Sequence, residues 1–272
     1  TPSGLGKRLG ALYGADEFAL SLDYVGLNHL GWLRHAWYQG RDLVADVLAD
    51  PARLSRLEEA DLFGMPWLQA LGCLPNEYLY YWYFTREAVA GISGAEQTRG
   101  QFLVDQQARF YRDAAESPHR ALELWRRAHG EREATYMAEA REDGAERPDL
   151  SGGGYERVAL ALMRAIALND RAEMILNVRN GDTISELPPD AVIEVPSLVD
   201  CAGAHPLAVA RPGNAELGLM LPVKAVEQLI IRAVVEGERE LAFTALAKHP
   251  LVDSVNIARQ LTDRFWPEPS VG

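Results

Sequence analysis

The residues best suited to chemistry gather in the segment GLNHLGW at 26–32. A histidine between small and apolar residues, at the end of a strand, can present one ring nitrogen to a metal or a substrate. Asn28 can orient the His29 ring or bind a hydroxyl group. The alternative is a buried, hydrogen-bonded core histidine, and the local pattern on its own favours that alternative.

A second segment, PNEYLYYWY at 75–83, is dense in aromatic side chains. Aromatic residues at a helix start can line a sugar site, although core packing is the more common reason for such a cluster. Tyr78 would act as a base only beside a cation or a metal, because the pKa of a free phenol is about 10.

Two further segments contain groups that can bind anions. Thr98-Arg99-Gly100 places an arginine at a helix start, where a guanidinium can bind a phosphate through two hydrogen bonds. Ser151–Tyr155 is a glycine-rich loop before a helix, and its backbone N–H groups can bind an anion. A surface arginine and a plain linker are the alternatives that composition favours.

Hydrophobic periodicity places these segments in a mostly helical chain with a central strand block. We expect two strands in Ser21–Tyr38 around a kink at Asn28-His29. Further strands are expected at Met174–Val178, Ala191–Val195 and Leu207–Ala210. Helices are expected at Leu5–Tyr13, Arg41–Ala49, Ser55–Phe63, Pro75–Gly91, Gln97–Ala115, Pro118–Asp143, Tyr155–Leu168, Glu216–Lys248 (broken near Pro222 and Gly237) and Val252–Phe265. The expected fold is one α+β domain over 1–272 with a frayed tail at 266–272.

Composition narrows the class of partner. The 272 residues are 48% hydrophobic, which is typical of a soluble globular protein, and no apolar run is long enough to span a bilayer. A net charge of −12 argues against binding to a nucleic-acid backbone. Cys73 and Cys201 form no CxxC pair, so we expect a reduced, cytoplasmic protein without a cysteine-rich zinc site. No predicted strand leads into a GxGxxG turn, so this chain offers no dinucleotide cradle.

The four chemical segments, in this order, resemble glycoside hydrolase family 4, especially its 6-phospho-β-glucosidase branch. The resemblance covers nearly the whole chain. It rests on GLNHLGW at 26–32, LGCLPNEYLYYWY at 71–83, TRGQ at 98–101, GGGY at 152–155, NVRNGDTISELPPDAVIEVP at 177–196 and HPLV at 249–252.

The resemblance implies a two-domain protein of which this chain is the C-terminal part. Family members have an N-terminal Rossmann domain that binds NAD, followed by an α+β domain similar to the C-terminal domain of lactate dehydrogenase. The Rossmann domain is absent from this chain. The turn Thr1–Gly4 looks like the family's Pro-x-Gly turn, which would place a Cys metal ligand just before Thr1. Family members are dimers or tetramers, so a homo-oligomer is expected.

The resemblance also implies an exception to the usual paired-carboxylate hydrolysis. NAD takes a hydride from C3 of the sugar, a base removes the C2 proton, the aglycone leaves by elimination, and water then adds. A divalent metal, typically manganese, binds the C2 and C3 oxygens as a Lewis acid. By this resemblance His29 is a metal ligand, Tyr78 is the C2 base, Arg99 lies near a substrate phosphate and Asn28 contacts the sugar.

Two segments depart from the family pattern. The family often has arginine where this chain has Tyr80, and RGGAYY where this chain has Ser151 to Glu156. A carboxylate at Glu156 would repel a phosphate that it faced, so the 6-phosphate requirement is less secure than the family. An unphosphorylated or α-linked glycoside or a glucuronide is the alternative substrate. A non-catalytic sugar-binding or oligomerisation module is the alternative function, and the chain alone is expected to be inactive.

Overall fold

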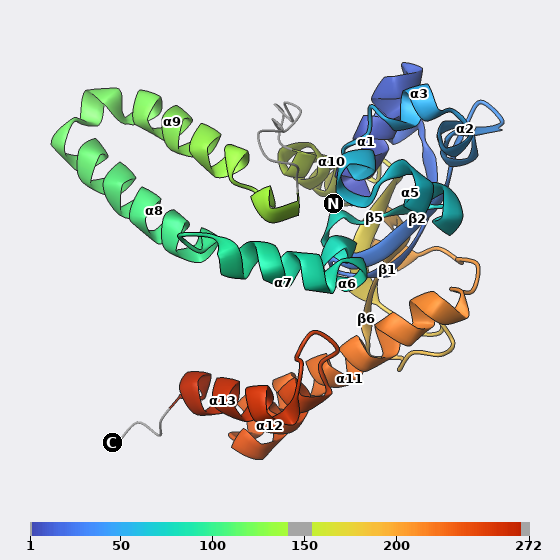
Figure 1. The fold of residues 1–272 in the computed structure, drawn as a ribbon. Helices are drawn as coiled ribbons and strands as arrows, with labels where there is room; N and C mark the ends of the chain where they lie inside the picture. Colours follow the sequence, from blue (N-terminus) through green and yellow to red (C-terminus); the bar gives the residue numbers. More distant parts are fainter. Residues whose placement is uncertain (1, 141–153, 268–272) are drawn as a thin grey trace.

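The computed structural model describes residues 2–140 and 154–267, and Figure 1 shows a central sheet from which two groups of helices project. The two strands expected in Ser21–Tyr38 are confirmed, with the kink at the predicted place. The strands are β1 (Ser21–Leu27), β2 (Leu30–Tyr38), β3 (Arg41–Asp42), β4 (Leu74–Pro75), β5 (Ala172–Arg179), β6 (Val192–Asp200) and β7 (Gly203–Pro206).

The sheet joins the two strand blocks in one layer. Its order is β3-β2-β1-β6-β5, with β4 paired to β2 and β7 paired to β6, and the pairs within the described residues are antiparallel. β1 lies in the middle, because it forms a hairpin with β2 and also pairs with β6 at Gly26 and Glu194. The turn of the hairpin is therefore held from both sides. The expected mixture of helices with a central strand block is confirmed.

Helices make up most of the remaining described chain. Several of them begin at a residue whose side chain accepts a backbone N–H, including Asp42, Thr98 and Ser254. The helices are α1 (Pro2–Tyr13), α2 (Leu43–Ala49), α3 (Pro51–Leu54), α4 (Glu58–Phe63), α5 (Met65–Leu71), α6 (Tyr80–Tyr83), α7 (Thr85–Gly94), α8 (Arg99–Glu116), α9 (Ala121–Ala134), α10 (Gly154–Leu168), α11 (Asn214–Glu236), α12 (Arg239–Lys248) and α13 (Val255–Phe265). Short 3₁₀ turns are η1 (Glu17–Ala19), η2 (Glu77–Leu79), η3 (Pro118–Arg120) and η4 (Ala138–Ala140).

The core lies between the hairpin and the N-terminal helices. α1 and α2 pack on β2, and α5 packs on α2 and β4. Leu9, Trp32, Val44 and Leu68, from α1, β2, α2 and α5, are fully buried in one apolar cluster. Burial of such side chains contributes roughly 1.5–3 kcal/mol each, so this cluster fixes the hairpin against the N-terminal helices.

Two helical arms leave this core, as Figure 1 shows. The first arm is α7–α9, in which α8 and α9 pack against each other as a hairpin; the second arm is α11–α13, packed in sequence order. Both arms carry exposed apolar side chains, for example Val104 and Trp125 on the first and Val234 and Val235 on the second. Within the described residues, no helix is both long and apolar enough to cross a membrane.

Two of the expected long helices are wrong. Pro75–Gly91 is not one helix, because Pro75 belongs to β4 and Phe84, at φ −121° and ψ 41°, separates α6 from α7. Pro118–Asp143 is not one helix either: α9 ends at Ala134, and Met137 has a left-handed backbone with φ 49°. In both cases the interruption makes the following side chains point in a direction that a continuous helix would not give them.

Two further predictions fail for backbone reasons. The strand expected at Leu207–Ala210 does not form, because the strand in this region, β7, lies earlier and ends at Pro206; beyond it the Leu207 N–H still donates to β6, to the Pro196 carbonyl at 2.9 Å. The break expected near Pro222 does not occur, since α11 continues through this proline with Met220 and Val226 buried on its two sides. The break at Gly237 is confirmed, with a left-handed backbone there. Most of the expected frayed tail, residues 268–272, lies outside the described residues, and likeness to lactate dehydrogenase stays a prediction.

Candidate functional site

The site begins at the two-residue turn of the β1–β2 hairpin. Leu27 pairs with Leu30, which leaves Asn28 and His29 in the turn. His29 has φ 67°, a left-handed backbone that is uncommon outside glycine. Both side chains are exposed, whereas the residues on either side are buried. The hairpin therefore presents the imidazole outward, and His29 is not the buried core histidine that the local pattern favours.

Glycines at 26 and 31 set the shape of the hairpin. They face each other across the two strands, and a Cβ on Gly26 would lie 2.3 Å from the Cα of Gly31. A Cβ on Gly31 would lie 2.2 Å from the Tyr24 hydroxyl oxygen. That hydroxyl donates to Glu194 Oε2 at 2.9 Å, and burial raises the pKa of the Glu194 carboxyl. The two glycines thus make room for a buried phenol–carboxyl contact directly beneath the turn.

Backbone hydrogen bonds fix Tyr78 to the same hairpin. The Asn76 N–H donates to the Gly31 carbonyl at 2.8 Å, and Asn76 Oδ1 accepts the Tyr78 N–H at 3.0 Å. β4, just before Asn76, pairs with β2. As a result the rings of His29 and Tyr78 lie 4.2 Å apart between centroids, tilted by 40°. The structure therefore brings together two of the predicted site residues.

Tyr136 is a member of the site that the sequence motifs do not contain. It follows α9, and its hydroxyl oxygen lies 2.6 Å from the Tyr78 hydroxyl oxygen and 2.9 Å from Glu77 Oε1. The two tyrosines are 58 residues apart. Tyr136 lies within the expected helix Pro118–Asp143, and no local pattern indicates a contact over that separation.

Charge near these rings keeps one group ionised and one neutral. Burial acts to raise the pKa of Glu77, whereas the positive charge of Arg8 and the hydrogen bond from the Tyr136 hydroxyl act to lower it. Partial burial lowers the pKa of His29, although Glu77 opposes that shift. At neutral pH the site therefore presents a carboxylate and a neutral imidazole. A neutral imidazole is the form that binds a metal.

Arg99 lies on the outer side of Tyr136. Its guanidinium carbon lies 5.2 Å from the centre of the Tyr136 ring, and Nη1 donates to Thr135 Oγ1 at 2.9 Å. Thr98 begins α8 by accepting the Gln101 N–H at 3.2 Å. Arg99 is thus held at the end of the first arm and reaches Tyr78 only through Tyr136. His29, Tyr78, Tyr136 and Arg99 form one continuous row.

The remaining sequence candidates fall elsewhere. Ser151 lies outside the described residues, as does most of its loop, and nothing is described of the Glu156 side chain. Tyr80, where the family often has arginine, is buried and stacks on Phe84 at 5.2 Å between ring centroids. Cys73 is buried, and burial raises the pKa of its thiol to about 12, which fits a structural role in the core.

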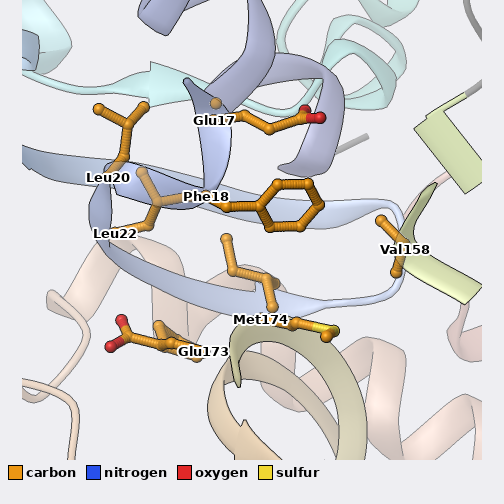
Figure 2. Close-up of a pocket in the computed structure, with 10 residues that line it drawn as sticks. Glu17, Phe18, Leu20, Leu22, Val158, Glu173 and Met174 are labelled. Carbon is orange, nitrogen blue, oxygen red and sulfur yellow. The ribbon is translucent and has the colours of Figure 1, made fainter. Parts of the chain in front are cut away.

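The enclosed hollow drawn in Figure 2 is not part of this row. It is lined mainly by apolar side chains, including Phe18, Leu22, Val158 and Met174, with Glu17 and Glu173 at its edge. Its volume is about 50 Å³, whereas ligand sites usually measure roughly 300–1,000 Å³. We interpret it as a packing gap between η1, α10 and β5. An open aromatic groove of about 580 Å³ lies beside α5 and α6 and is lined by Phe63, Pro66, Trp67, Trp82, Tyr83 and Phe84.

One described residue has the chemistry of a metal ligand. His29 offers an exposed, neutral imidazole, which suits a divalent transition metal. Within residues 2–140 and 154–267 no three His, Cys, Asp or Glu side chains are grouped to hold an ion. Toward a metal, the described residues thus offer the single imidazole of His29 at this place.

Comparison with known proteins finds relatives among the phospho-glucosidases. The chain is 26% identical to the 6-phospho-beta-glucosidase of Thermotoga maritima, covering 95% of this chain and 57% of that protein. It is 27% identical to the maltose-6′-phosphate glucosidase of Fusobacterium mortiferum, covering 98% of this chain and 60% of that protein. The chain thus spans less than two thirds of the curated relatives that it matches.

Solved structures give the same result for the fold. A structure of the Thermotoga maritima 6-phospho-beta glucosidase, with manganese, NAD+ and glucose-6-phosphate, matches with a TM-score of 0.71 at 26% identity. That match covers 96% of this chain and 56% of the other chain. The family model described as the family 4 glycosyl hydrolase C-terminal domain matches residues 24–252. This chain belongs to family 4 of the glycosyl hydrolases, as a C-terminal domain of that family.

Proposed function

We propose that this chain is the catalytic C-terminal domain, over 1–272, of an NAD- and manganese-dependent glycosidase acting on 6-phospho-β-glucosides. The observation that carries the proposal is the ring pair of His29 and Tyr78, 4.2 Å apart at an exposed hairpin end. Family membership gives this pair its chemical meaning, since a histidine ligand and a phenol base are what the resemblance implies at these positions.

The named relatives support a phosphorylated sugar more strongly than they support its anomer. The Thermotoga maritima relative is named a 6-phospho-beta-glucosidase, and relatives in Fusobacterium and Bacillus are named maltose-6′-phosphate glucosidases. A 6-phospho-alpha-glucosidase of Leptotrichia buccalis also matches. The phosphate is common to these names, whereas the linkage is not. We therefore propose the β-linkage as the finer claim, to be tested separately.

Each site residue has a role that its position supports. His29 would hold the metal through its neutral imidazole. A bound metal would supply Lewis-acid chemistry to the sugar oxygens, and bound NAD would supply hydride transfer. Tyr78, half-buried beside His29, would remove the C2 proton. Asn28, exposed in the same turn, would bind a sugar hydroxyl.

Arg99 is placed to meet the phosphate. A guanidinium carries five N–H donors, and only part of them face Thr135 and the Arg132 carbonyl. The remaining donors would bind a phosphate through two parallel hydrogen bonds. The Arg99 side chain is half-buried, so solvent screens that contact only in part.

The rest of the proposed protein would supply the nucleotide site and the missing metal ligand. The matched relatives are longer than this chain, and a Rossmann domain is what the resemblance implies for the remainder. The exposed apolar side chains of α10 and of the second arm support contacts with that domain and with a second copy of the chain. Leu160, Met163, Val234 and Val235 are examples.

The test is a turnover assay of the complete gene product with nitrophenyl 6-phospho-β-glucoside. Turnover that requires NAD and manganese, and that is lost without the 6-phosphate, is the expected result. Turnover of the unphosphorylated or α-linked analogue instead would move the protein to another substrate within the family. Absence of turnover with every glycoside, together with sugar binding, would favour a non-catalytic module. Residues 1–272 alone are expected to show no turnover.

A further inference from the structure

The position of Tyr136 in the row suggests more than packing. Its hydroxyl oxygen is in hydrogen-bond range of both Tyr78 and Glu77, at 2.6 and 2.9 Å. A phenol has one proton to donate, and the Glu77 carboxylate can only accept. While Tyr78 is a neutral phenol, both contacts are satisfied when Tyr136 donates to Glu77 and accepts the proton of Tyr78. Once Tyr78 is the phenolate that takes the C2 proton, the Tyr136 hydroxyl donates to Tyr78 instead. The hydroxyl oxygen of Tyr78 thus has a defined hydrogen-bond partner, the Tyr136 hydroxyl.

The fold holds Tyr136 at this place from two sides. The next residue, Met137, has φ 49° and is buried in the core cluster. A non-glycine residue keeps such a backbone only where its surroundings enforce it. On the outer side, Arg99 stacks over the Tyr136 ring at 5.2 Å and donates to Thr135. The ring is therefore clamped between the core and the first arm.

Glu77 is an equally fixed anchor. It is 5% exposed and lies in η2, between Asn76, which caps that turn, and Tyr78. Arg8, on α1, contributes a positive charge that favours the carboxylate. A buried carboxylate with these partners has little freedom to move. A hydroxyl bonded to it inherits that restraint.

We propose that Tyr136 is a positioning residue for Tyr78: anchored on Glu77, its hydroxyl fixes the hydroxyl oxygen of the Tyr78 ring, which itself lies against the His29 imidazole. The inference rests on the proposed function, in which Tyr78 is the base that takes the C2 proton. Misplacement of a reacting group by about 1 Å can cost on the order of 100-fold in rate. Loss of the hydrogen bond that positions the Tyr78 hydroxyl should therefore lower kcat more than it weakens substrate binding.

The first experiment compares Tyr136→Phe with Tyr111→Phe in the complete gene product, with NAD, manganese and a 6-phospho-β-glucoside. Tyr136→Phe keeps the ring on which Arg99 stacks and removes only the hydroxyl. Tyr111, on α8, is 66% exposed and lies outside the row, which makes it a matched control. We expect Tyr136→Phe to lower kcat by roughly 10- to 100-fold with KM changed less than about threefold, and Tyr111→Phe to change neither.

A coupling measurement separates positioning from general damage. In a Tyr78→Phe background, Tyr136→Phe should add no further loss, because the hydroxyl that it positions is already gone. Glu77→Gln, which keeps an acceptor oxygen, should show a smaller kcat loss than Tyr136→Phe. Deuterium incorporation from solvent at C2 should slow in proportion to kcat.

A readout that needs no turnover keeps the two proposals distinguishable. In protein labelled with ¹³C at the tyrosine Cζ, the Tyr78 resonance should shift in Tyr136→Phe and stay in place in Tyr111→Phe. An unshifted Tyr78 resonance, or a kcat within twofold of wild type, would overturn the positioning role. So would a full additive loss in the Tyr78→Phe background. A shifted resonance in a protein that hydrolyses no glycoside would support the contact and overturn the proposed function.

Discussion

The hairpin region and the helical arms use their apolar side chains in opposite ways. In the hairpin, Tyr24 and Trp32 are fully buried, and the turn that they support carries the exposed His29. On the second arm, Val234 and Val235 are 71% and 79% exposed. The hairpin therefore holds its geometry through contacts inside this chain, whereas the arms carry apolar surface that is satisfied only by further contacts.

The site lies at the junction of these two regions. His29 and Tyr78 belong to the hairpin and the segment hydrogen-bonded to it. Arg99 comes from the first arm, and Tyr136 lies just after that arm ends at Ala134. His29 and Tyr78 are thus held by the more deeply buried region, and the groups that surround them come from the less enclosed one. Substitutions in the two regions should separate chemistry from association.

The largest effect is expected at the hairpin end. His29→Ala should abolish metal-dependent turnover of the complete protein, because it removes the imidazole and leaves the buried strands untouched. Turnover and thermal unfolding are the measurements, with His205→Ala as a control on an exposed histidine of β7. Turnover equal to wild type would remove His29 from the metal site and break the assignment of chemistry to the hairpin.

A second substitution tests how tightly the hairpin is packed. Gly31→Ala places a Cβ 2.2 Å from the Tyr24 oxygen and should lower the free energy of unfolding by about 1–3 kcal/mol. Gly130→Ala, in α9 of the first arm, meets no atom within 4 Å and should raise it by roughly 0.5–1 kcal/mol. Urea denaturation followed by circular dichroism measures both. Equal effects of the two substitutions would erase the contrast between hairpin and arm.

The exposed face of the second arm should govern association and not folding. The double substitution Val234→Glu and Val235→Glu should shift the protein toward monomer, because two charges cannot be buried in an apolar contact. Because both positions are exposed, the free energy of unfolding of the protein should change by less than about 1 kcal/mol. Sedimentation velocity over a range of concentrations gives the mass. An unchanged mass would show that this face is not where copies meet.

The smallest effect concerns the pH dependence of stability. Burial raises the pKa of Glu194 in the folded state, so its favourable contribution is present below its unfolded pKa and is lost as pH rises through the folded pKa. The free energy of unfolding of Glu194→Gln should therefore increase relative to that of wild type as pH rises from about 4 to about 8. Glu186→Gln is a control of opposite sign, because the Arg211 side chain lowers the pKa of Glu186. Urea titrations across this range decide between the two signs.

Local patterns predicted the hairpin well and the arms less well. The alternation in Ser21–Tyr38 and the pair Asn28-His29 sufficed to place both strands and the turn, because the signals act over a few residues. The sequence also gave four candidate residues, of which His29 and Tyr78 are brought into contact. Their roles, and those of Asn28 and Arg99, stay predictions.

The missed features depend on contacts between distant segments. Tyr136 reaches Tyr78 only because α9 stops at Ala134 and Met137 takes a left-handed backbone. No glycine or proline stands at Ala134 or Met137 that would predict the helix end or the left-handed backbone. The continuation of α11 through Pro222 is similar, since burial of Met220 and Val226 outweighs one lost backbone hydrogen bond. Tertiary packing, which periodicity does not report, decides these cases.

The hydrogen bond from the Asn76 N–H to the Gly31 carbonyl has a consequence for directed evolution of this protein. This hydrogen bond joins the segments 26–32 and 75–83. We therefore expect that the distance between the His29 imidazole and the Tyr78 phenol cannot be adjusted by changing either segment alone. Libraries that vary the first arm would leave that spacing intact while reshaping what surrounds it. We expect altered substrate preference to emerge from residues such as Arg99 and its neighbours, and randomised hairpins to yield mostly inactive proteins.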